Sequence, residues 1–354
     1  MKYKTSLVFT CISVVLLIIL FLLLQGQSFS LSSEDISYEK HKGAHYFARV
    51  DSAFAQPLEE HNIEWVAWVS WAYQDDYNTT DLTHHNGDST MIKKSNASWV
   101  ETIKSIRQQG YKVFVKPHIW LTRPSKGKWR SHITFTDEKD WNTWKKNYRD
   151  FMLRYAALAE LAGAEMFCIG TELSELTIDK PEYWRELIND IRKIYSGKLT
   201  YGANWYHEYE NIAFWDDLDY IGVQAYFPLT KNERPTTAQI EQGWQKYLPQ
   251  LQSLSERFQK KILFTELGYR STLKAASEPW LWIEHSCNNP EDYSPETQAN
   301  SYTAFFNQVW PKEWFGGVHL WQLKDFPIKE DRIDLNFTPR GKPASKIIAN
   351  RFSE

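Results

Sequence analysis

The chain has 354 residues, of which 42% are hydrophobic and 24% are charged, with a formal net charge of −3. This length and apolar fraction are sufficient for one large core, and α/β barrels commonly reach this size as a single domain. The net charge is small and the basic residues are dispersed. The charge pattern therefore does not indicate a nucleic-acid partner.

Aromatic residues are unusually abundant: 17 Trp, 19 Tyr and 19 Phe make up 16% of the chain. Part of this content belongs in the core, since Trp is highly buried on average. Sugar rings, however, present flat C–H faces that stack on indole and phenol rings. The excess therefore favours an enzyme that holds several sugar units in a cleft.

Residues 7–24 form a nearly continuous apolar segment that follows Lys2 and Lys4. This order of charge and apolar residues is typical of a secretory signal or an uncleaved signal anchor. We therefore expect residues 1–33 to be a signal segment with a linker, and residues 34–354 to be the catalytic domain. The domain is expected to be monomeric and exported: secreted, periplasmic, or tethered to the membrane through residues 7–24.

Strand-like apolar runs then alternate with amphipathic segments along the chain. The expected strands are 43–47, 63–70, 112–119, 166–171, 198–204, 220–226, 261–265 and 317–321.

Helices are expected between these strands. A capping box at Ser98 predicts a helix over 98–109, and the apolar period predicts another over 137–162. Ser294 and Asp179 each precede a proline in the manner of an N-cap residue.

Eight strands alternating with helices favour a single-domain (β/α)8 TIM barrel over an open doubly wound sheet. The glycine-rich phosphate loops of nucleotide-binding sheets are absent, and no metal-ligand spacing is present. We therefore expect neither a cofactor nor a metal. With only three cysteines, a disulfide framework is not indicated.

Catalytic groups of such barrels lie at the C-terminal ends of the strands. The residues at those positions here are Trp71, His118, Trp120, Glu172, Asn204, Trp205, Tyr226, Glu266 and Trp321. They are carboxylates, aromatic groups and amides. Since no Ser or Cys nucleophile stands at a strand end, acyl transfer is disfavoured.

Two glutamates at strand ends suit the cleavage of a glycosidic bond, which needs one group to protonate the leaving oxygen and another to attack or direct water. Glu172 ends the fourth strand and Glu266 ends the seventh. In one barrel they would face each other at about 5–5.5 Å, the separation of a retaining mechanism. We assign Glu172 as acid/base and Glu266 as nucleophile. The alternative for either glutamate is a structural salt bridge at the barrel mouth.

The strings GTELSE, YGANW, ILFTELGYRS and HLWQ resemble the retaining glycoside hydrolases of clan A. Within that clan, residues 43–326 are similar to glycoside hydrolase family 113, whose characterised members are endo-β-1,4-mannanases. The resemblance implies a polysaccharide or oligosaccharide substrate, with Glu172 as acid/base and Glu266 as nucleophile. It also implies that Tyr226 steers the nucleophile's carboxylate and that Trp321 floors the subsite of the sugar under attack.

One position departs from the clan pattern: Thr171 stands where many members have an asparagine that binds the 2-hydroxyl. Asn204 is a candidate to replace that contact. Trp71, Trp120 and Trp205 are candidate stacking platforms.

His118 has two interpretations. It could bond a sugar hydroxyl or tune Glu172, or it could be a neutral histidine satisfied by a neighbouring backbone group. For the whole protein, the alternatives are a retaining glycosidase of another β-linked glycan such as a glucan, and a non-catalytic carbohydrate-binding barrel. Retention of both glutamates argues against the binder, because a binder needs neither.

Overall fold

The computed structural model describes residues 39–47, 50–51, 54–83, 89–281, 289–324 and 333–354. Residues Lys40–Glu354 form one compact unit. The apolar segment 7–24, on which the expected export and tether rest, lies outside the described residues. Among the helices that are described, none is long and apolar enough to cross a membrane.

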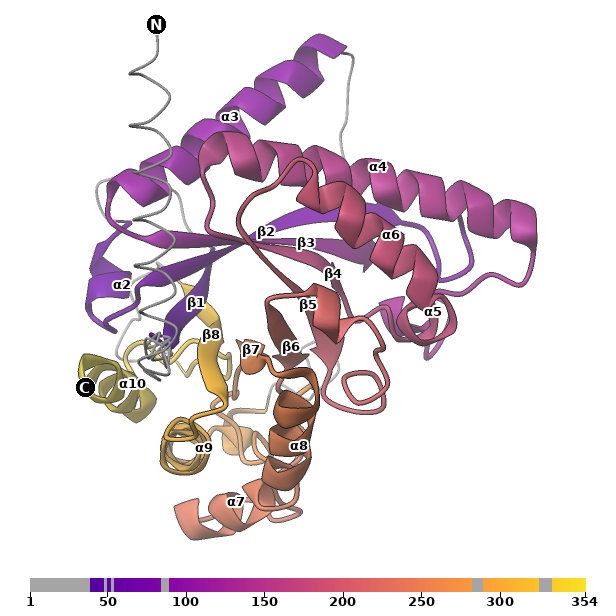
Figure 1. Cartoon of the computed structure of the whole chain (residues 1–354). Helices are drawn as coiled ribbons and strands as arrows, with labels where there is room; N and C mark the ends of the chain where they lie inside the picture. Colours follow the sequence, from indigo (N-terminus) through magenta and orange to yellow (C-terminus); the bar gives the residue numbers. More distant parts are fainter. Residues whose placement is uncertain (1–38, 48–49, 52–53, 84–88, 282–288, 325–332) are drawn as a thin grey trace, which may run out of the picture. The chain divides into compact units, whose positions relative to one another are not determined.

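Eight parallel strands close into a barrel in sequence order, as predicted (Figure 1). The strands are β1 (His41–Phe47), β2 (Trp65–Gln74), β3 (Lys112–Leu121), β4 (Met166–Thr171), β5 (Lys198–Asn204), β6 (Tyr220–Gln224), β7 (Lys261–Leu267) and β8 (Phe315–Lys324).

Helices surround the barrel (Figure 1). They are α2 (Gln56–Glu59), α3 (Ser89–Gln108), α4 (Glu138–Ala162), α5 (Ser174–Asp179), α6 (Pro181–Arg192), α7 (Thr237–Trp244), α8 (Leu248–Phe258), α9 (Pro295–Gln308) and α10 (Pro343–Ser353). Helices α3 and α4 contact β3, and α8 contacts β7.

Two predicted helix starts are confirmed. The Asp137 side chain accepts a hydrogen bond from the Asp140 backbone N–H at 3.0 Å and caps α4, which ends at Gly163 with a φ of 73°. Ser294 caps α9 in the same way through the Thr297 N–H. In both cases a side chain satisfies a backbone donor that lacks a partner within the helix.

Two other predicted starts are wrong. Helix α3 begins at Ser89, so Ser98 lies in its interior. Lys93, Lys94, Ser95 and Ala97, which precede Ser98 in this helix, are exposed, and no apolar period marks this part of the helix. Asp179 is the last residue of α5, and Lys180 occupies the N-cap of α6 without a side-chain cap.

The connection from β5 to β6 also differs from the expected pattern. Residues 205–219, described throughout, form turns and the short 3₁₀ helix η2 (Trp215–Asp217) in place of an α-helix. Tyr209, Phe214 and Trp215 are buried there, and Phe214 stacks on Trp184 of α6 at 5.7 Å. Aromatic rings thus cover the outer face of the barrel where a helix was expected.

The barrel interior has an apolar layer towards the N-terminal ends of the strands, made of Trp65, Ala67, Phe114, Met166, Cys168, Tyr220 and Leu263. Cys168 lies on the inward face of β4, two residues from Met166 on the same side. Its thiol is free and completely buried, so Cys168 is a small core residue.

Candidate active site

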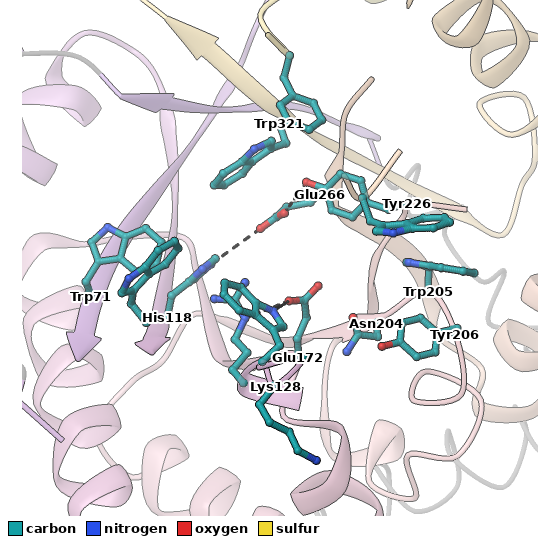
Figure 2. A pocket seen from close by; sticks show the side chains of 16 residues that line it. Trp71, His118, Lys128, Glu172, Asn204, Trp205, Tyr206, Tyr226, Glu266 and Trp321 are labelled. Atoms are coloured by element: carbon teal, nitrogen blue, oxygen red, sulfur yellow. Dashed lines mark hydrogen bonds and ion pairs between the residues drawn. The ribbon is translucent and has the colours of Figure 1, made fainter. Parts of the chain in front are cut away.

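A cavity of about 610 Å³ opens at the C-terminal ends of the strands. All nine strand-end residues singled out from the sequence line it. Figure 2 shows Glu172 and Glu266 pointing into this cavity from opposite sides. Its volume is within the usual range of ligand sites, about 300–1,000 Å³.

Glu266 faces the cavity because β7 is irregular at its end. The register of β7 shifts against β6 at Gln224 and against β8 between Phe264 and Leu267. Such a bulge re-aims a side chain. It allows Thr265, which donates to Gln224 Oε1 at 3.1 Å, and its neighbour Glu266 both to face the interior.

Two donors hold the carboxylate of Glu266. The ammonium group of Lys116 contacts Oε1, and the hydroxyl of Tyr226 donates to Oε2 at 2.7 Å. Lys116 is completely buried and also donates to Gln224 Oε1 at 2.8 Å. Burial, and then the charge of Glu266, raise the pKa of Tyr226 well above its usual value, so this hydroxyl stays protonated and remains a donor.

The histidines near Glu266 do not supply the positive charge. The Nε2 atoms of His45 and His118 each lie 3.9 Å from Glu266 Oε1. Burial, and then the charge of Lys116, lower the pKa of both histidines well below the usual value, so both are neutral near pH 7. We therefore treat only Lys116 as the ionic partner of Glu266.

His118 is neutral, as one of its two interpretations required, but it is not satisfied by a backbone group. Within the described residues, neither of its ring nitrogens has a hydrogen-bond partner. The ring is 2% exposed, lines the cavity and packs edge-to-face against Trp71 at 5.1 Å. A neutral imidazole with one donor and one acceptor thus lies in the cavity wall, with both nitrogens buried.

Glu172 has an unusual backbone conformation, with a φ of 54° in the left-handed region. Its backbone N–H donates to Gly202 O at 2.9 Å. Its Oε2 atom accepts hydrogen bonds from Arg130 Nε at 3.0 Å and from Trp129 Nε1 at 3.2 Å. Non-glycine residues adopt this region rarely and at a cost, and such residues cluster at functional sites.

Both glutamates therefore form ion pairs, which was the structural alternative for each. Glu172 pairs with Arg130, and Glu266 pairs with Lys116. Two separate structural salt bridges would not account for the shared surroundings, because both carboxylates line one cavity between aromatic side chains. The geometry thus combines fixed carboxylates with an accessible space between them.

Aromatic rings flank the glutamates on two sides (Figure 2). On one side Trp120 packs edge-to-face against both Trp71, at 5.7 Å, and Trp129, at 5.6 Å. On the other, Trp205 stacks on Trp280 at 5.2 Å with an interplanar angle of 21°.

Asn204 and Thr171 are placed differently. Asn204 lines the cavity and is 5% exposed. Thr171 is buried beside Cys168, with its Oγ1 atom 3.9 Å from that thiol, and is not part of the cavity lining. Of the two side chains, only the Asn204 amide can reach a ligand in this cavity.

Sequence reasoning missed several residues of the site. The further lining residues are Gly127, Lys128, Trp129, Arg130, Tyr206, Trp280 and Phe337. Lys116 was also missed, although a single lysine at an alternate position of an apolar strand, between Phe114 and His118, is a usable signal. In the described part of the chain, no cluster of His, Cys, Asp or Glu is arranged to hold a metal ion.

A closed (β/α)8 barrel with two carboxylates at strand ends in one aromatic-lined cavity is the arrangement of a glycoside hydrolase. The model of Glycoside Hydrolase Family 113 matches residues 36–342, and the chain belongs to this family.

Solved structures agree with this assignment. The chain is similar to a GH113 β-1,4-mannanase, with 25% identity and a TM-score of 0.76, over 89% of this chain and 99% of that one. It is similar to the GH113 β-mannanase of Alicyclobacillus acidocaldarius, solved in complex with ManMIm, with 25% identity and a TM-score of 0.73 over 89% and 97% of the two chains. A β-glucuronidase from Ruminococcus gnavus shares only the fold, with 15% identity and a TM-score of 0.59 over 88% of this chain and 50% of that one. Among curated proteins, none matches the chain.

Proposed function

We propose that this glycoside hydrolase cleaves internal β-1,4 linkages of mannan-type polysaccharides with net retention of configuration. The observation that carries the proposal is the pair Glu172 and Glu266, which face each other in one cavity with aromatic rings on both sides (Figure 2). Family membership and the mannanase structures at 25% identity support the choice of substrate.

The proposed reaction has two displacements. In the first, a carboxylate oxygen of Glu266 attacks the anomeric carbon while Glu172 transfers its proton to the departing glycosidic oxygen. In the second, Glu172 takes a proton from water, the water oxygen attacks the anomeric carbon, and the bond to Glu266 breaks. Water is thus added across the linkage and both glutamates return to their starting state.

The surroundings of the two glutamates support this division of roles. Glu266 has an ionised amine and a hydroxyl as its donors, and this pairing suits an ionised nucleophile. Both contacts of Glu172 are made to Oε2, from the guanidinium of Arg130 and the indole of Trp129. These contacts orient Glu172 without blocking its other oxygen.

The remaining groups of the cavity are proposed to bind sugar. Trp321 floors the subsite of the sugar under attack, and Trp71, Trp120 and Trp205 offer stacking surfaces. His118 and Asn204 supply hydrogen bonds to hydroxyl groups. Aromatic rings on both sides of the glutamates favour a chain that extends in both directions, as internal cleavage requires.

The test is a substrate panel of mannan, glucomannan, cellulose and xylan, read by release of reducing ends, with NMR of the first product. We expect activity on mannan, oligosaccharide products and the β-anomer first. Preference for cellulose would redirect the proposal to a glucanase, and an inverted first product would remove Glu266 as nucleophile. No activity on any member, with binding retained, would favour the non-catalytic barrel.

Two variants test the roles. Glu266→Ala should abolish turnover of every substrate. Glu172→Ala should retain activity on aryl glycosides with good leaving groups, and azide should rescue it, because neither needs the proton; acid/base help is otherwise worth about 10²- to 10⁴-fold. Equal losses on activated and polymeric substrates would contradict this division.

We also propose that the enzyme acts outside the cytoplasm, on the basis of the apolar segment 7–24 behind two lysines. Fractionation of cells that express the full chain tests this. Activity confined to the cytoplasm would refute it.

A further inference from the structure

Glu208 is a buried carboxylate that does not line the cavity and that the proposed reaction does not use. It lies in the helix-free connection between β5 and β6 and is 0% exposed. It accepts hydrogen bonds from the Asn204 N–H at 2.7 Å, Asn204 Nδ2 at 3.2 Å, the Tyr201 hydroxyl at 2.6 Å and the Thr177 hydroxyl at 3.0 Å. Four neutral donors match the acceptor capacity of the carboxylate that Glu208 becomes above about pH 7, the value to which burial raises its pKa.

The first consequence of this arrangement concerns Asn204. Its amide group donates to Ser174 Oγ at 2.9 Å and to Glu208 Oε2. An ionised carboxylate can only accept hydrogen bonds, so the NH₂ side of the amide must face Glu208. Both amide protons are thereby used, and only the carbonyl oxygen of Asn204 is left for a ligand in the cavity.

The second consequence concerns the turn that carries Glu172. The Tyr201 hydroxyl that donates to Glu208 also accepts a hydrogen bond from the Leu173 N–H at 2.6 Å. Leu173 directly follows Glu172, whose φ of 54° needs support from its surroundings. A chain of two hydrogen bonds therefore connects Glu208 to the backbone of the proposed acid/base.

We infer that Glu208 is a positioning residue that presents Asn204 to the substrate as a hydrogen-bond acceptor only and holds the turn at Glu172. The ligand group recognised at Asn204 is accordingly a sugar hydroxyl that donates its proton. This inference deepens the proposed function and rests on it for the identity of the substrate, but not for the hydrogen-bond arrangement.

The test is a double-mutant cycle of Glu208→Gln and Asn204→Ala, assayed above pH 7 on the best substrate of the panel. Glu208→Gln keeps the shape and removes the charge, so kcat/KM should fall about 10- to 100-fold, the value of a hydrogen bond to a charged group. In the Asn204→Ala background, Glu208→Gln should lower kcat/KM much less, because the amide that Glu208 orients is absent. Additive losses, or no loss, would overturn the inference.

A matched pair of variants separates positioning from general stability. Tyr201→Phe removes the hydroxyl between Glu208 and Leu173, and should lower kcat on polysaccharide more than on activated aryl glycosides, which need no proton from Glu172. Tyr209→Phe removes another buried hydroxyl of the same region, whose partner is Gln250 at 2.7 Å, and should leave both rates unchanged. Equal effects of the two variants would indicate a merely structural role for Tyr201.

A readout without substrate separates this inference from the proposed function. In NMR spectra of the free enzyme, the Asn204 side-chain amide and the Leu173 backbone amide should be protected from hydrogen exchange. Glu208→Gln should remove the protection of the Asn204 amide, and Tyr201→Phe that of Leu173. Unchanged protection in both variants would refute the inference even if the enzyme cleaves mannan, and loss of protection would support it even if the substrate is another glycan.

Discussion

At the scale of single residues, Glu172 combines a functional side chain with an unfavourable backbone. Its φ of 54° places it in the region that glycine tolerates best. For other residues this conformation costs roughly 1–2 kcal/mol. This backbone conformation therefore lowers the free energy of unfolding, and it directs the carboxylate of Glu172 into the cavity.

This cost predicts an order of stability between two inactive variants. We expect Glu172→Gly to be more stable than Glu172→Ala by about 1 kcal/mol, because only alanine keeps the strain. At Glu175, in α5, the order should reverse by about 1 kcal/mol, since glycine is unfavourable in a helix. Urea denaturation of the four variants measures both differences, and an Ala-over-Gly order at position 172 would contradict the strain.

Lys116 and Glu266 form a buried pair in which each charge depends on the other. Lys116→Met leaves the Glu266 carboxylate without its cation, and we expect a loss of about 3–5 kcal/mol in the free energy of unfolding. Adding Glu266→Gln removes the second charge and should recover much of this loss. Guanidinium denaturation provides the measurement.

Lys146→Met is the control for this pair. Lys146 pairs with Asp150 on the exposed surface of α4, where such pairs contribute less than about 1 kcal/mol. If the double variant at positions 116 and 266 were no more stable than Lys116→Met alone, mutual charge compensation would not be the cause.

Because of Glu208, we expect the free energy of unfolding to fall as the pH rises from about 4.5 to 7. Burial raises the pKa of its carboxyl from the ordinary value of 4.5 to about 7, although its hydrogen bonds oppose the shift. Between these values the folded protein keeps the proton and the unfolded chain loses it. Below pH 4.5 the carboxyl therefore does not lower the free energy of unfolding. Above that pH it lowers the free energy of unfolding increasingly, until about pH 7.

We expect the free energy of unfolding of the wild type, relative to Glu208→Gln, to fall by about 3 kcal/mol between pH 4.5 and pH 7, at 1.36 kcal/mol per unit. Denaturation curves of the two proteins across this range test the shift. Parallel pH profiles would show that Glu208 titrates normally.

At the scale of elements, the helix ends distinguish local signals that the fold uses from those it overrides. Ser98 opens a capping box in the sequence but lies inside α3, whereas Asp137, at the start of a predicted apolar period, caps α4. The difference arises because α3 already begins at Ser89, nine residues before the apparent cap. A capping motif therefore predicts a start only where the residues before it cannot be helical.

Alanine substitutions test this distinction. Asp137→Ala should cost about 1 kcal/mol, the usual value of a lost N-cap. Ser98→Ala should be neutral or slightly stabilising, because alanine is the best residue in an exposed helix interior. Thermal denaturation measures both, and comparable losses would place a helix start at Ser98.

The strands were predictable because parallel strands buried on both faces are continuous apolar runs. The bounds of β4 and β5 agree with the prediction. β2, β3 and β7 extend beyond their predicted ends, and the added residues include Trp71, Trp120 and Glu266 of the site. Strand ends of this kind resemble loops in the sequence even though their backbones stay paired.

At the scale of the whole molecule, the barrel brings the C-terminal ends of all strands together around one cavity. Nine lining residues could therefore be predicted from their positions at strand ends. The other lining residues come from the loops that follow the strands and could not be named in this way. Trp129 and Arg130 reach Glu172 from the loop after β3, and Trp280 reaches Trp205 from the loop after β7. Lys116 and Glu208 are charged residues in the interior, where such side chains are rare.

The barrel should not depend on the first residues of the chain. We expect a chain that begins after Ser33 to be soluble, monomeric and active, because the strands and helices described here lie within Lys40–Glu354. Size-exclusion chromatography with light scattering and the mannan assay check this, with the full chain as control. Aggregation, or folding only in detergent, would show that the first 33 residues are part of the structure.

The stacked pair Trp205 and Trp280 gives the enzyme a built-in optical signal. The Trp280 side chain is 41% exposed and its ring centroid lies 5.2 Å from that of Trp205 in the cavity lining, so water reaches one indole of the stacked pair. A sugar ring that covers this pair would displace the water, and the native fluorescence would move to shorter wavelength. In the Glu266→Ala variant, where nothing is cleaved, oligosaccharide binding can therefore be followed without a label.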